Sequence, residues 1–373
     1  MSSKTKKKRA KPISKRTVLA IVAVFLAVVI LALSLVLIFT QEEKVMRYEG
    51  HALREDVYAY WFSAYKYQYL VAYKHLGIAD TESGWAQIDE GSGKSYNDAF
   101  KSAIDREIAL RFVASVLFDK SGASLSEGDL EAIGTTLADM DEYAYGEKMY
   151  KTLKREYGIS KSDLKRIALY ETKYKALLSV RFGTDFSGVY TTEHREALAK
   201  FFSDHYKRYN IVYLSDEKNS QKQADLRDFI VGGTTEEAFT EWEREYSESR
   251  VTEDYPNGIY LYDGIRYGGV FSEELLSAFD SLEVGECCEV RNAKDDGSYF
   301  VMRYALDEAP YLSSDNKVQK SLDGFAEYAA RSLYREELQA CLEDVSWVTE
   351  ITDAYTPVAV KKEQDYNVVN LLG

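Results

Sequence analysis

The chain has 373 residues, a formal net charge of −14 and 46% hydrophobic residues. Eight basic residues and no acidic residue precede Thr17, so residues 41–373 alone carry a net charge of −22. A region this acidic repels nucleic acid, and we expect no nucleic-acid partner. The cysteines, Cys287, Cys288 and Cys341, are too few to hold a fold by disulfides, and the histidines show no metal-ligand spacing. We therefore expect no cofactor or metal, and cysteines that are small buried or edge residues.

Residues 17–40 form an apolar stretch without charge, glycine or proline. As a helix rising about 1.5 Å per residue, this stretch is long enough to cross the ~30 Å hydrocarbon core of a bilayer. Because residues 1–16 are basic, we predict a single-pass cell-membrane protein with a cytoplasmic N-terminus and residues 41–373 outside. The alternative is a cleaved secretory signal. Against it, the apolar run exceeds a usual signal and leads into Gln41-Glu42-Glu43 rather than a small-residue cleavage site.

Residues 41–205 are predicted to be mainly helical. A short strand at 44–50 precedes a helix at 53–76, which Gly77 ends. Eight aromatic residues lie nearly all round that helix, so other helices must cover it, or it offers an apolar surface to a client. We favour burial. Apolar residues at steps of four predict the next helix at 96–120.

Two capping boxes then predict helix starts. In each, a serine hydroxyl (Ser126, Ser160) accepts a hydrogen bond from a free backbone N–H of the first turn. The carboxylate of an aspartate three residues later (Asp129, Asp163) reaches back to the backbone N–H of the serine. The helices predicted in this part of the chain are 126–156, 160–181 and 192–206.

From Tyr209 the pattern changes to short strands and helices, with a hairpin signal at Asp296-Gly297. This order suits a small α+β domain around an antiparallel sheet. The predicted elements are a strand at 210–214, helices at 222–231 and 235–247, a turn at 255–258, a helix at 272–282, and strands at 288–291 and 299–304.

Three segments resemble the parvulin class of peptidyl-prolyl isomerases. They are Phe239-x-x-Trp242-x-x-x-Tyr246-Ser247, Leu276-Ser-Ala-Phe-Asp-Ser-Leu-Glu-Val-Gly-Glu286, and Tyr299-Phe-Val-Met-Arg-Tyr304. The preceding helices, opened by Gly122-Ala-Ser-Leu-Ser126 and Tyr157-Gly-Ile-Ser160, are similar to the chaperone domain of SurA/PrsA-type extracytoplasmic foldases. The resemblance implies an α+β protein with an N-terminal transmembrane helix and a mainly helical chaperone-like domain, into which a small parvulin-like domain is inserted.

The chain departs from this family at positions that matter for catalysis. Parvulin-class enzymes usually carry histidines where this chain has Asn210 and Phe300, and an ungapped count places their pocket aromatic at Glu274 and their pocket methionine at Val270. A glutamate there would oppose the dry enclosure that a proline ring needs, whereas a shift of one or two residues would put Leu275 or Leu276 in the pocket instead. We expect Asn210 and Phe300 to fill the sheet core. The peptide-binding set that the resemblance implies is Asn210, Tyr262, Val270, Phe279 and Phe300, and no catalytic residue is predicted.

After Pro310, residues 316–345 read as one long helix with an apolar face, which we expect to pack on the helices of residues 53–205. Residues 346–360 are predicted to add a strand. The predicted organisation is a basic tail (1–16), the anchor (17–40), a helical domain (41–205, completed by 309–347), the parvulin-like domain (206–308) and a C-terminal strand and tail (348–373).

These observations together predict a membrane-anchored, extracytoplasmic foldase or chaperone-like protein. Its partners would be unfolded or exported polypeptides and the lipid bilayer, and its prolyl isomerase activity would be weak or absent. Two alternatives stay open from sequence. One is an active peptidyl-prolyl isomerase, and the other is a non-catalytic interaction module of an envelope complex.

Overall fold

The computed structural model describes residues 43–143, 147–157, 159–249, 254–255, 258–265, 267–291 and 296–360. The chain divides into two compact units, one running to Lys173 and resuming at Cys341, the other comprising Tyr174–Ala340. The domain boundaries predicted at 206 and 308 fall inside the second unit and stay predictions. The predicted anchor, residues 17–40, lies outside the described residues, and within the described part of the chain no helix is long and apolar enough to cross a membrane.

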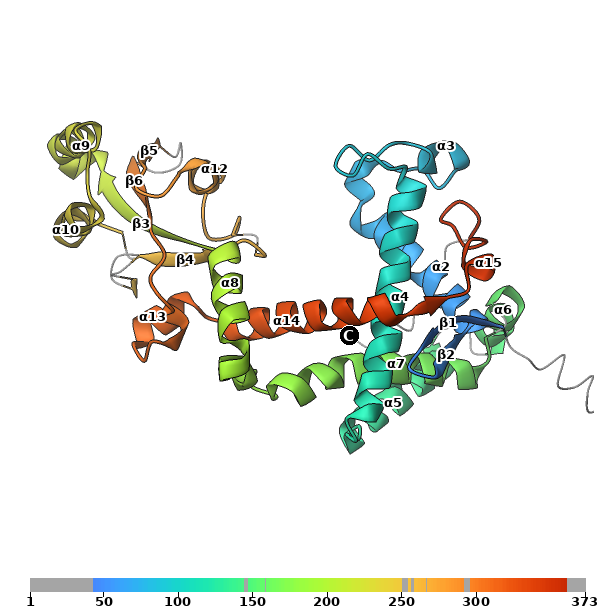
Figure 1. The fold of residues 1–373 in the computed structure, drawn as a ribbon. Coiled ribbons are helices and arrows are strands. Elements are labelled where there is room, and N and C mark those ends of the chain that lie inside the picture. The colour runs from blue at the N-terminus through green and yellow to red at the C-terminus, as the bar shows by residue number, and fades with distance from the viewer. Residues whose placement is uncertain are drawn as a thin grey trace, which may run out of the picture. The chain divides into compact units, whose positions relative to one another are not determined.

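A three-stranded antiparallel sheet joins the N-terminal and C-terminal segments of the chain that make up the first unit (Figure 1). The central strand β1 (Lys44–Tyr48) pairs with β2 (His51–Arg54) on one side and with β7 (Ser346–Trp347) on the other. The strands predicted at 44–50 and within 346–360 are therefore confirmed. The second is only two residues long, and the short helix α15 (Thr349–Thr352) follows it.

The aromatic helix α2 (Glu55–Ala72) is covered by other elements over its first half. Aromatic side chains on all sides of that half are buried: Tyr58, Tyr60, Trp61, Phe62 and Tyr65. Its principal partner is α4 (Tyr96–Lys120), whose bounds match the prediction. Burial of the aromatic helix is thus confirmed for this half, whereas Tyr73, just past its end, is 42% exposed.

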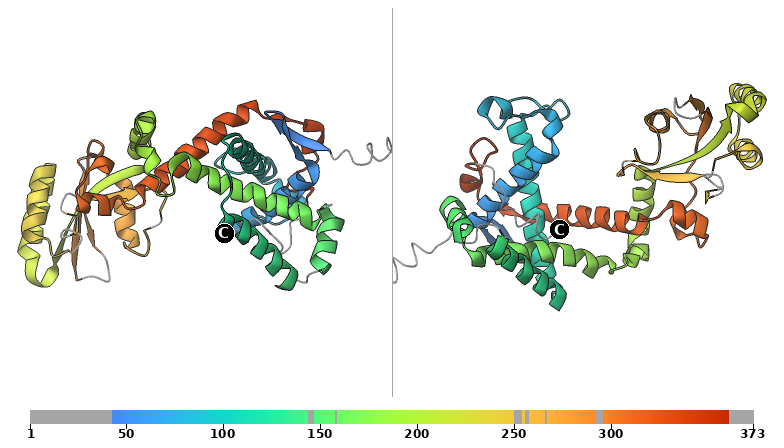
Figure 2. Two further views of the ribbon diagram at one scale, coloured as in Figure 1. Left: turned by 90° about the horizontal axis from the view of Figure 1, so that it is seen from below. Right: turned by 180° about the vertical axis from the view of Figure 1, so that it is seen from behind.

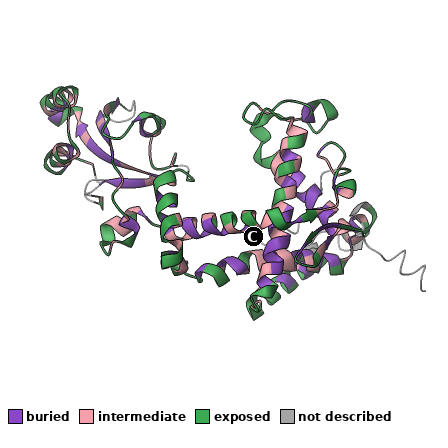
Figure 3. Ribbon diagram, in the orientation of Figure 1, coloured by how far each residue is buried: buried purple, intermediate pink, exposed green. Residues whose placement is uncertain are grey.

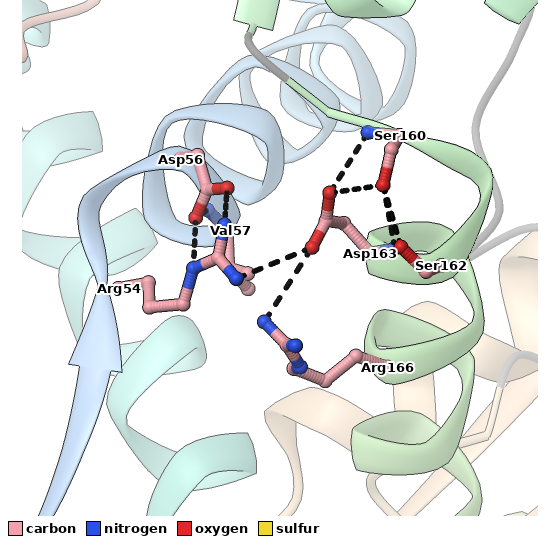
Figure 4. Close-up of polar contacts among 7 residues, drawn as sticks. All are labelled: Arg54, Asp56, Val57, Ser160, Ser162, Asp163 and Arg166. Carbon is pink, nitrogen blue, oxygen red and sulfur yellow. Dashed lines mark hydrogen bonds and ion pairs between the residues drawn. The ribbon is translucent and has the colours of Figure 1, made fainter. Parts of the chain in front are cut away.

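Both capping boxes form, and one of them is part of a larger ion-pair cluster. Ser126 caps α5 (Glu127–Tyr143) and Ser160 caps α7 (Lys161–Phe182). In the second box the Asp163 carboxylate also meets the Arg54 guanidinium at the end of β2, 3.4 Å away, and that of Arg166 at 3.5 Å (Figure 4). The box therefore connects α7 to the sheet as well as capping its own helix.

The remaining helices of this half are short. In place of the single helix predicted at 126–156 there are two, α5 and α6 (Glu147–Tyr157), on either side of residues 144–146, which lie outside the described ranges. The other helical segments up to residue 205 are η1 (Lys74–Leu76), α3 (Glu82–Trp85), η2 (Ser187–Tyr190), η3 (Thr192–His194) and α8 (Arg195–His205).

The second unit contains a four-stranded antiparallel sheet of order β4-β3-β6-β5. Its strands are β3 (Tyr206–Ser215), β4 (Ile259–Tyr262), β5 (Cys287–Arg291) and β6 (Gly297–Tyr304). Strand β4 was not predicted, because Ile-Tyr-Leu-Tyr directly after the Gly258 turn is too short to show alternation. The edge strand β5 carries Cys287 and Cys288, both free, as expected for edge residues.

Helices cover both faces of this sheet. Helices α9 (Asp216–Val231) and α10 (Glu236–Tyr246) lie on one face, and α12 (Glu273–Ser281) lies on the other (Figures 1 and 2). Each face has its own apolar cluster, and the two central strands, β3 and β6, are largely buried between them (Figure 3).

The prediction of one long helix at 316–345 is wrong in one respect. The segment forms two helices, α13 (Asn316–Ser321) and α14 (Phe325–Cys341), because Gly324 adopts a left-handed φ of +76°. Its apolar side chains are buried: Leu322, Phe325 and Leu333 are 3%, 2% and 8% exposed.

The packing partners of this stretch are divided. Helix α13 contacts β4 and the 3₁₀ turn η4 (Pro310–Leu312), whereas α14 reaches α8 through Phe325 and α7 through the Tyr334 hydroxyl. The expected packing on the preceding helices therefore holds for α14 only.

Candidate peptide-binding site

The two faces of the second sheet have different chemistry because successive side chains of β3 and β6 alternate between them. On β3, Asn210 and Val212 face α9 and α10, whereas Tyr209 and Ile211 face α12. Phe300 lies opposite Val212 in the register and so shares the α9/α10 face.

The α9/α10 face is closed and contains the two positions where the resembled family has histidines. Asn210 is 2% exposed and Phe300 is fully buried. The Asn210 amide donates to the Glu243 carboxylate and, over 3.1 Å, to the Tyr304 hydroxyl. Burial raises the pKa of Tyr304 to about 12, so its hydroxyl stays protonated and donates to the Glu236 carbonyl. The interpretation of Asn210 and Phe300 as residues that fill the sheet core is confirmed.

The α12 face opens into a cavity of about 580 Å³. Most of the described residues that line it are apolar or tyrosine, and the others are serines and two charged residues. The lining residues are Ile211, Ile259, Leu261, Ile265, Val270, Phe271, Leu275, Tyr255, Tyr260, Tyr267, Tyr299, Tyr328, Ser249, Ser272, Ser321, Lys320 and Asp323. We call this cavity the α12-face pocket.

One wall of the α12-face pocket comes from α13 and α14 rather than from the sheet or α12. Lys320 lies on α13, Asp323 follows it, and Tyr328 lies on α14. The Tyr328 ring stacks on Tyr262 of β4, with ring centroids 4.7 Å apart and planes 15° from parallel. This stack fixes the α14 wall against the edge of the sheet.

The tyrosines give the pocket hydrogen-bonding groups at its apolar surface. Tyr267 accepts the Tyr262 backbone N–H over 3.0 Å, and burial raises the pKa of the Tyr267 hydroxyl above its ordinary value. Burial likewise raises the pKa of Tyr260, but Tyr260 pairs with Arg208 in the register, so its side chain lies on the Asn210 side of the sheet, where its hydroxyl donates to Asp307 over 2.5 Å. The Tyr267 hydroxyl stays protonated at neutral pH. An aromatic ring with a protonated hydroxyl can bury apolar surface and still pair with a peptide group.

Of the five residues predicted to bind peptide, the structure places one in the pocket lining. Val270 lines it and is 73% exposed. Phe279 lies one layer behind, in edge contact with Phe271 at 5.2 Å, and Tyr262 lies behind Tyr328. Asn210 and Phe300 are on the opposite sheet face, so the five are not brought together. Peptide binding by any of them stays a prediction.

The residue that the ungapped count gives for the family's pocket aromatic does not line the α12-face pocket. Glu274 is exposed and is not among the lining residues, whereas Leu275, one position later, is 5% exposed and faces the pocket. In α12 a shift of one residue turns the side chain by about 100°, which moves it from the solvent side to the sheet side.

Sequence reasoning missed most of the lining. The cluster Tyr255, Tyr260 and Tyr267 around the Gly258 turn was a usable signal, because tyrosines near turns often form binding surfaces. Tyr328 and the two charged residues gave no such signal, because their approach to the pocket depends on the break at Gly324. Among the residues described, no group of three or more histidine, cysteine or acidic side chains is placed to hold a metal ion.

Comparison with known proteins gives foldase structures and no sequence match. No family model matches the chain, and no curated protein matches it. PrsA from Bacillus subtilis is 15% identical, with 70% of this chain and 93% of that chain covered and a TM-score of 0.25. The foldase protein PrsA from Streptococcus pneumoniae is 16% identical, covering 73% and 90%, with a TM-score of 0.23. Foldase protein PrsA from Lactococcus lactis is 12% identical, covering 84% and 97%, with a TM-score of 0.24.

These structures belong to the type of foldase that the sequence resembles. Their TM-scores are low, which means that the whole chains superpose poorly. What the site can do is therefore decided by its own residues.

Proposed function

We propose that this chain is a membrane-anchored, extracytoplasmic foldase-like protein that binds unfolded or exported polypeptides, and that the α12-face pocket holds an apolar segment of the client. The observation that carries the proposal is the pocket itself, with about 580 Å³ of space lined mainly by apolar and tyrosine side chains. A cavity of this size and composition suits a few side chains of an extended peptide. Tyrosine hydroxyls and serines at its surface supply partners for the peptide groups of the client.

Binding is favoured over catalysis of prolyl isomerisation. Twisting an X-Pro bond meets a barrier of about 18–20 kcal/mol, and lowering it requires an enclosed ring and donors aimed at the twisted amide. Val270, at the position predicted for the pocket methionine, is 73% exposed and so leaves that side of the site open to water. No histidine or cysteine is among the described residues that line the pocket.

Active isomerisation is the second candidate, and one observation favours it. The pocket residue on α12 is the apolar Leu275, not Glu274, so the charge expected to oppose a proline ring is absent from the lining. An assay of cis–trans exchange on X-Pro peptides separates the two candidates. A rate comparable with that of an ordinary parvulin would establish the enzyme.

A charge placed in the pocket tests the binding proposal. Val270→Glu should weaken binding of an unfolded, fluorescently labelled polypeptide, because it adds a carboxylate to the apolar lining. Val231→Glu is the matched control, since Val231 ends α9 on the opposite sheet face and is 89% exposed. Equal affinities for both variants and the unmodified chain would contradict binding at this pocket and favour an interaction module that uses another surface.

The anchor is tested separately. Residues 17–40 should keep the full-length chain in the membrane after carbonate extraction, and protease added outside should remove the bulk of residues 41–373. A mature chain that begins after Thr40 would show that this stretch is a cleaved signal.

A further inference from the structure

The described residues that line the α12-face pocket carry few charges. Two of them are charged, Lys320 and Asp323, and Asp323 has no partner within the described ranges. The Lys320 ammonium is 2.8 Å from the Asp254 carboxylate and 5.2 Å from the centre of the Tyr255 ring. The Asp254 carboxylate offsets the Lys320 charge, so an acidic client group gains less from pairing with Lys320.

Asp323 differs from Lys320 in this respect. It is exposed, and within the described ranges no hydrogen bond or ion pair is recorded for its carboxylate. It lies between α13 and the Gly324 break, so a short non-helical segment presents it at the same side of the pocket as Ser321. With Lys320 engaged by Asp254, the remaining charge among the described lining residues is the negative one of Asp323.

The long-range electrostatic field of residues 41–373 is negative, like the charge of Asp323. Residues 41–373 carry a net charge of −22, so a cationic client is attracted and an anionic one repelled before contact. Such steering changes the association rate and is weakened by salt, whereas a local pair changes the dissociation rate. The two effects can therefore be measured apart.

We propose that the α12-face pocket selects polypeptide segments in which a lysine or arginine lies beside an apolar residue, and that Asp323 is the residue that pairs with this cation. This inference rests on the proposed function, because it assigns a client class to the same pocket. The apolar side chain enters the lining formed by Phe271 and Leu275, and the neighbouring basic side chain stays at the rim. The cation keeps most of its hydration there, so no buried charge is created.

The expected selectivity is modest because the pair is exposed. Exposed ion pairs contribute enough to change affinity by roughly 1.5- to 5-fold. A peptide with lysine beside its apolar anchor should therefore bind about 3-fold more tightly than the same peptide with glutamine. A glutamate peptide should bind more weakly than the glutamine peptide.

The test uses the full-length chain in detergent and three labelled peptides of one sequence, in which the residue beside a Leu-Phe anchor is lysine, glutamine or glutamate. A second set places the variable residue on the other side of the anchor. Asp323→Asn should bring the lysine-to-glutamine affinity ratio close to 1, and Asp323→Lys should invert the order. Asp228→Asn is the matched control, because it removes one negative charge from an exposed position of α9 on the opposite sheet face.

We expect the lysine-to-glutamine affinity ratio to be retained in Asp228→Asn and lost in Asp323→Asn. Equal affinity of the unmodified chain for the lysine and glutamine peptides, with Val270→Glu still weakening both, would overturn the selectivity and leave the proposed function standing. If none of the peptides binds, both the selectivity and the proposed function are overturned. A lysine preference unchanged by Asp323→Asn would assign the selectivity to the overall charge alone and would refute the role of Asp323.

Discussion

The two capping boxes allow one stability prediction to be worked out closely, because the same sequence motif occurs in two environments. In the first box the Asp129 carboxylate accepts the Ser126 N–H over 3.0 Å and its hydroxyl over 2.7 Å. In the second, Asp163 accepts the Ser160 N–H over 2.9 Å and its hydroxyl over 2.5 Å. Only the second carboxylate also meets Arg54 and Arg166, as far as the described residues show (Figure 4).

Asp163→Ala should therefore lower the free energy of unfolding by more than Asp129→Ala does. Loss of a cap interaction costs about 1 kcal/mol, which is the whole effect expected for Asp129→Ala. Asp163 is 6% exposed, and its removal also takes a carboxylate partner from the Arg54 side chain, which is 21% exposed and still bonded to Asp56. Breaking a fully buried pair costs about 3–5 kcal/mol, so the partial loss here brings the expected total to about 2–3 kcal/mol.

Urea unfolding of residues 41–373, followed by tryptophan fluorescence, measures both costs, since Trp61, Trp85 and Trp347 lie in the first unit. The pH dependence gives a second readout. Burial raises the pKa of Asp163, but the Ser160 hydrogen bonds and the two arginines outweigh it, and the net pKa lies below the ordinary value. A lowered folded-state pKa contributes stability that is present above the unfolded pKa of about 3.9 and is lost as the pH falls through the folded value.

The stability gap between the unmodified chain and Asp163→Asn should therefore narrow below about pH 4. Equal destabilisation by Asp129→Ala and Asp163→Ala would refute this reasoning, because it would show that the arginines add nothing to the second cap.

Three further predictions concern function. The rate at which residues 41–373 isomerise an X-Pro peptide should stay close to that of the uncatalysed exchange, which takes tens to hundreds of seconds. Replacing Asn210 and Phe300 by histidine should not raise this rate, because both positions are buried on the closed sheet face. A clear rate gain in the double variant would contradict that placement. Residues 41–373 should slow aggregation of an unfolded client, and no suppression at several-fold molar excess would favour the interaction-module alternative. A fragment of residues 206–308 should bind unfolded polypeptide more weakly than residues 174–340, because it lacks the wall formed by Lys320, Asp323 and Tyr328; equal affinity would show that this wall is dispensable.

Much of the fold could be predicted because its signals are local. The capping boxes, the aromatic helix and the turn glycines act within one or two helical turns, and each placed an element close to its observed bounds. Strand β4 and the break at Gly324 were missed for physical reasons. The first is four residues long, and the second interrupts an apolar pattern that would otherwise continue as one helix.

The site could be predicted less well than the fold. The resemblance to parvulins implied that Val270 takes the place of a pocket methionine, and Val270 does line the α12-face pocket. The sequence could not show that Asn210 and Phe300 lie away from the pocket, because alternation assigns them to one face of the sheet without saying which face opens into a cavity. The sequence also could not show that Asp323 and Tyr328 lie at the pocket. They are more than fifty residues away in sequence from Tyr262, the residue at the sheet edge that Tyr328 contacts.

The central claim is that the α12-face pocket binds client polypeptide, and site-specific photo-crosslinking tests it most directly. A photo-reactive amino acid would replace Val270 in one variant of the full-length, membrane-bound chain and Val231 in another, and each would be irradiated with an unfolded, labelled polypeptide. The account predicts a strong adduct at Val270, competed by unlabelled apolar peptide, and little adduct at Val231. Equal or absent labelling at the two positions would contradict it.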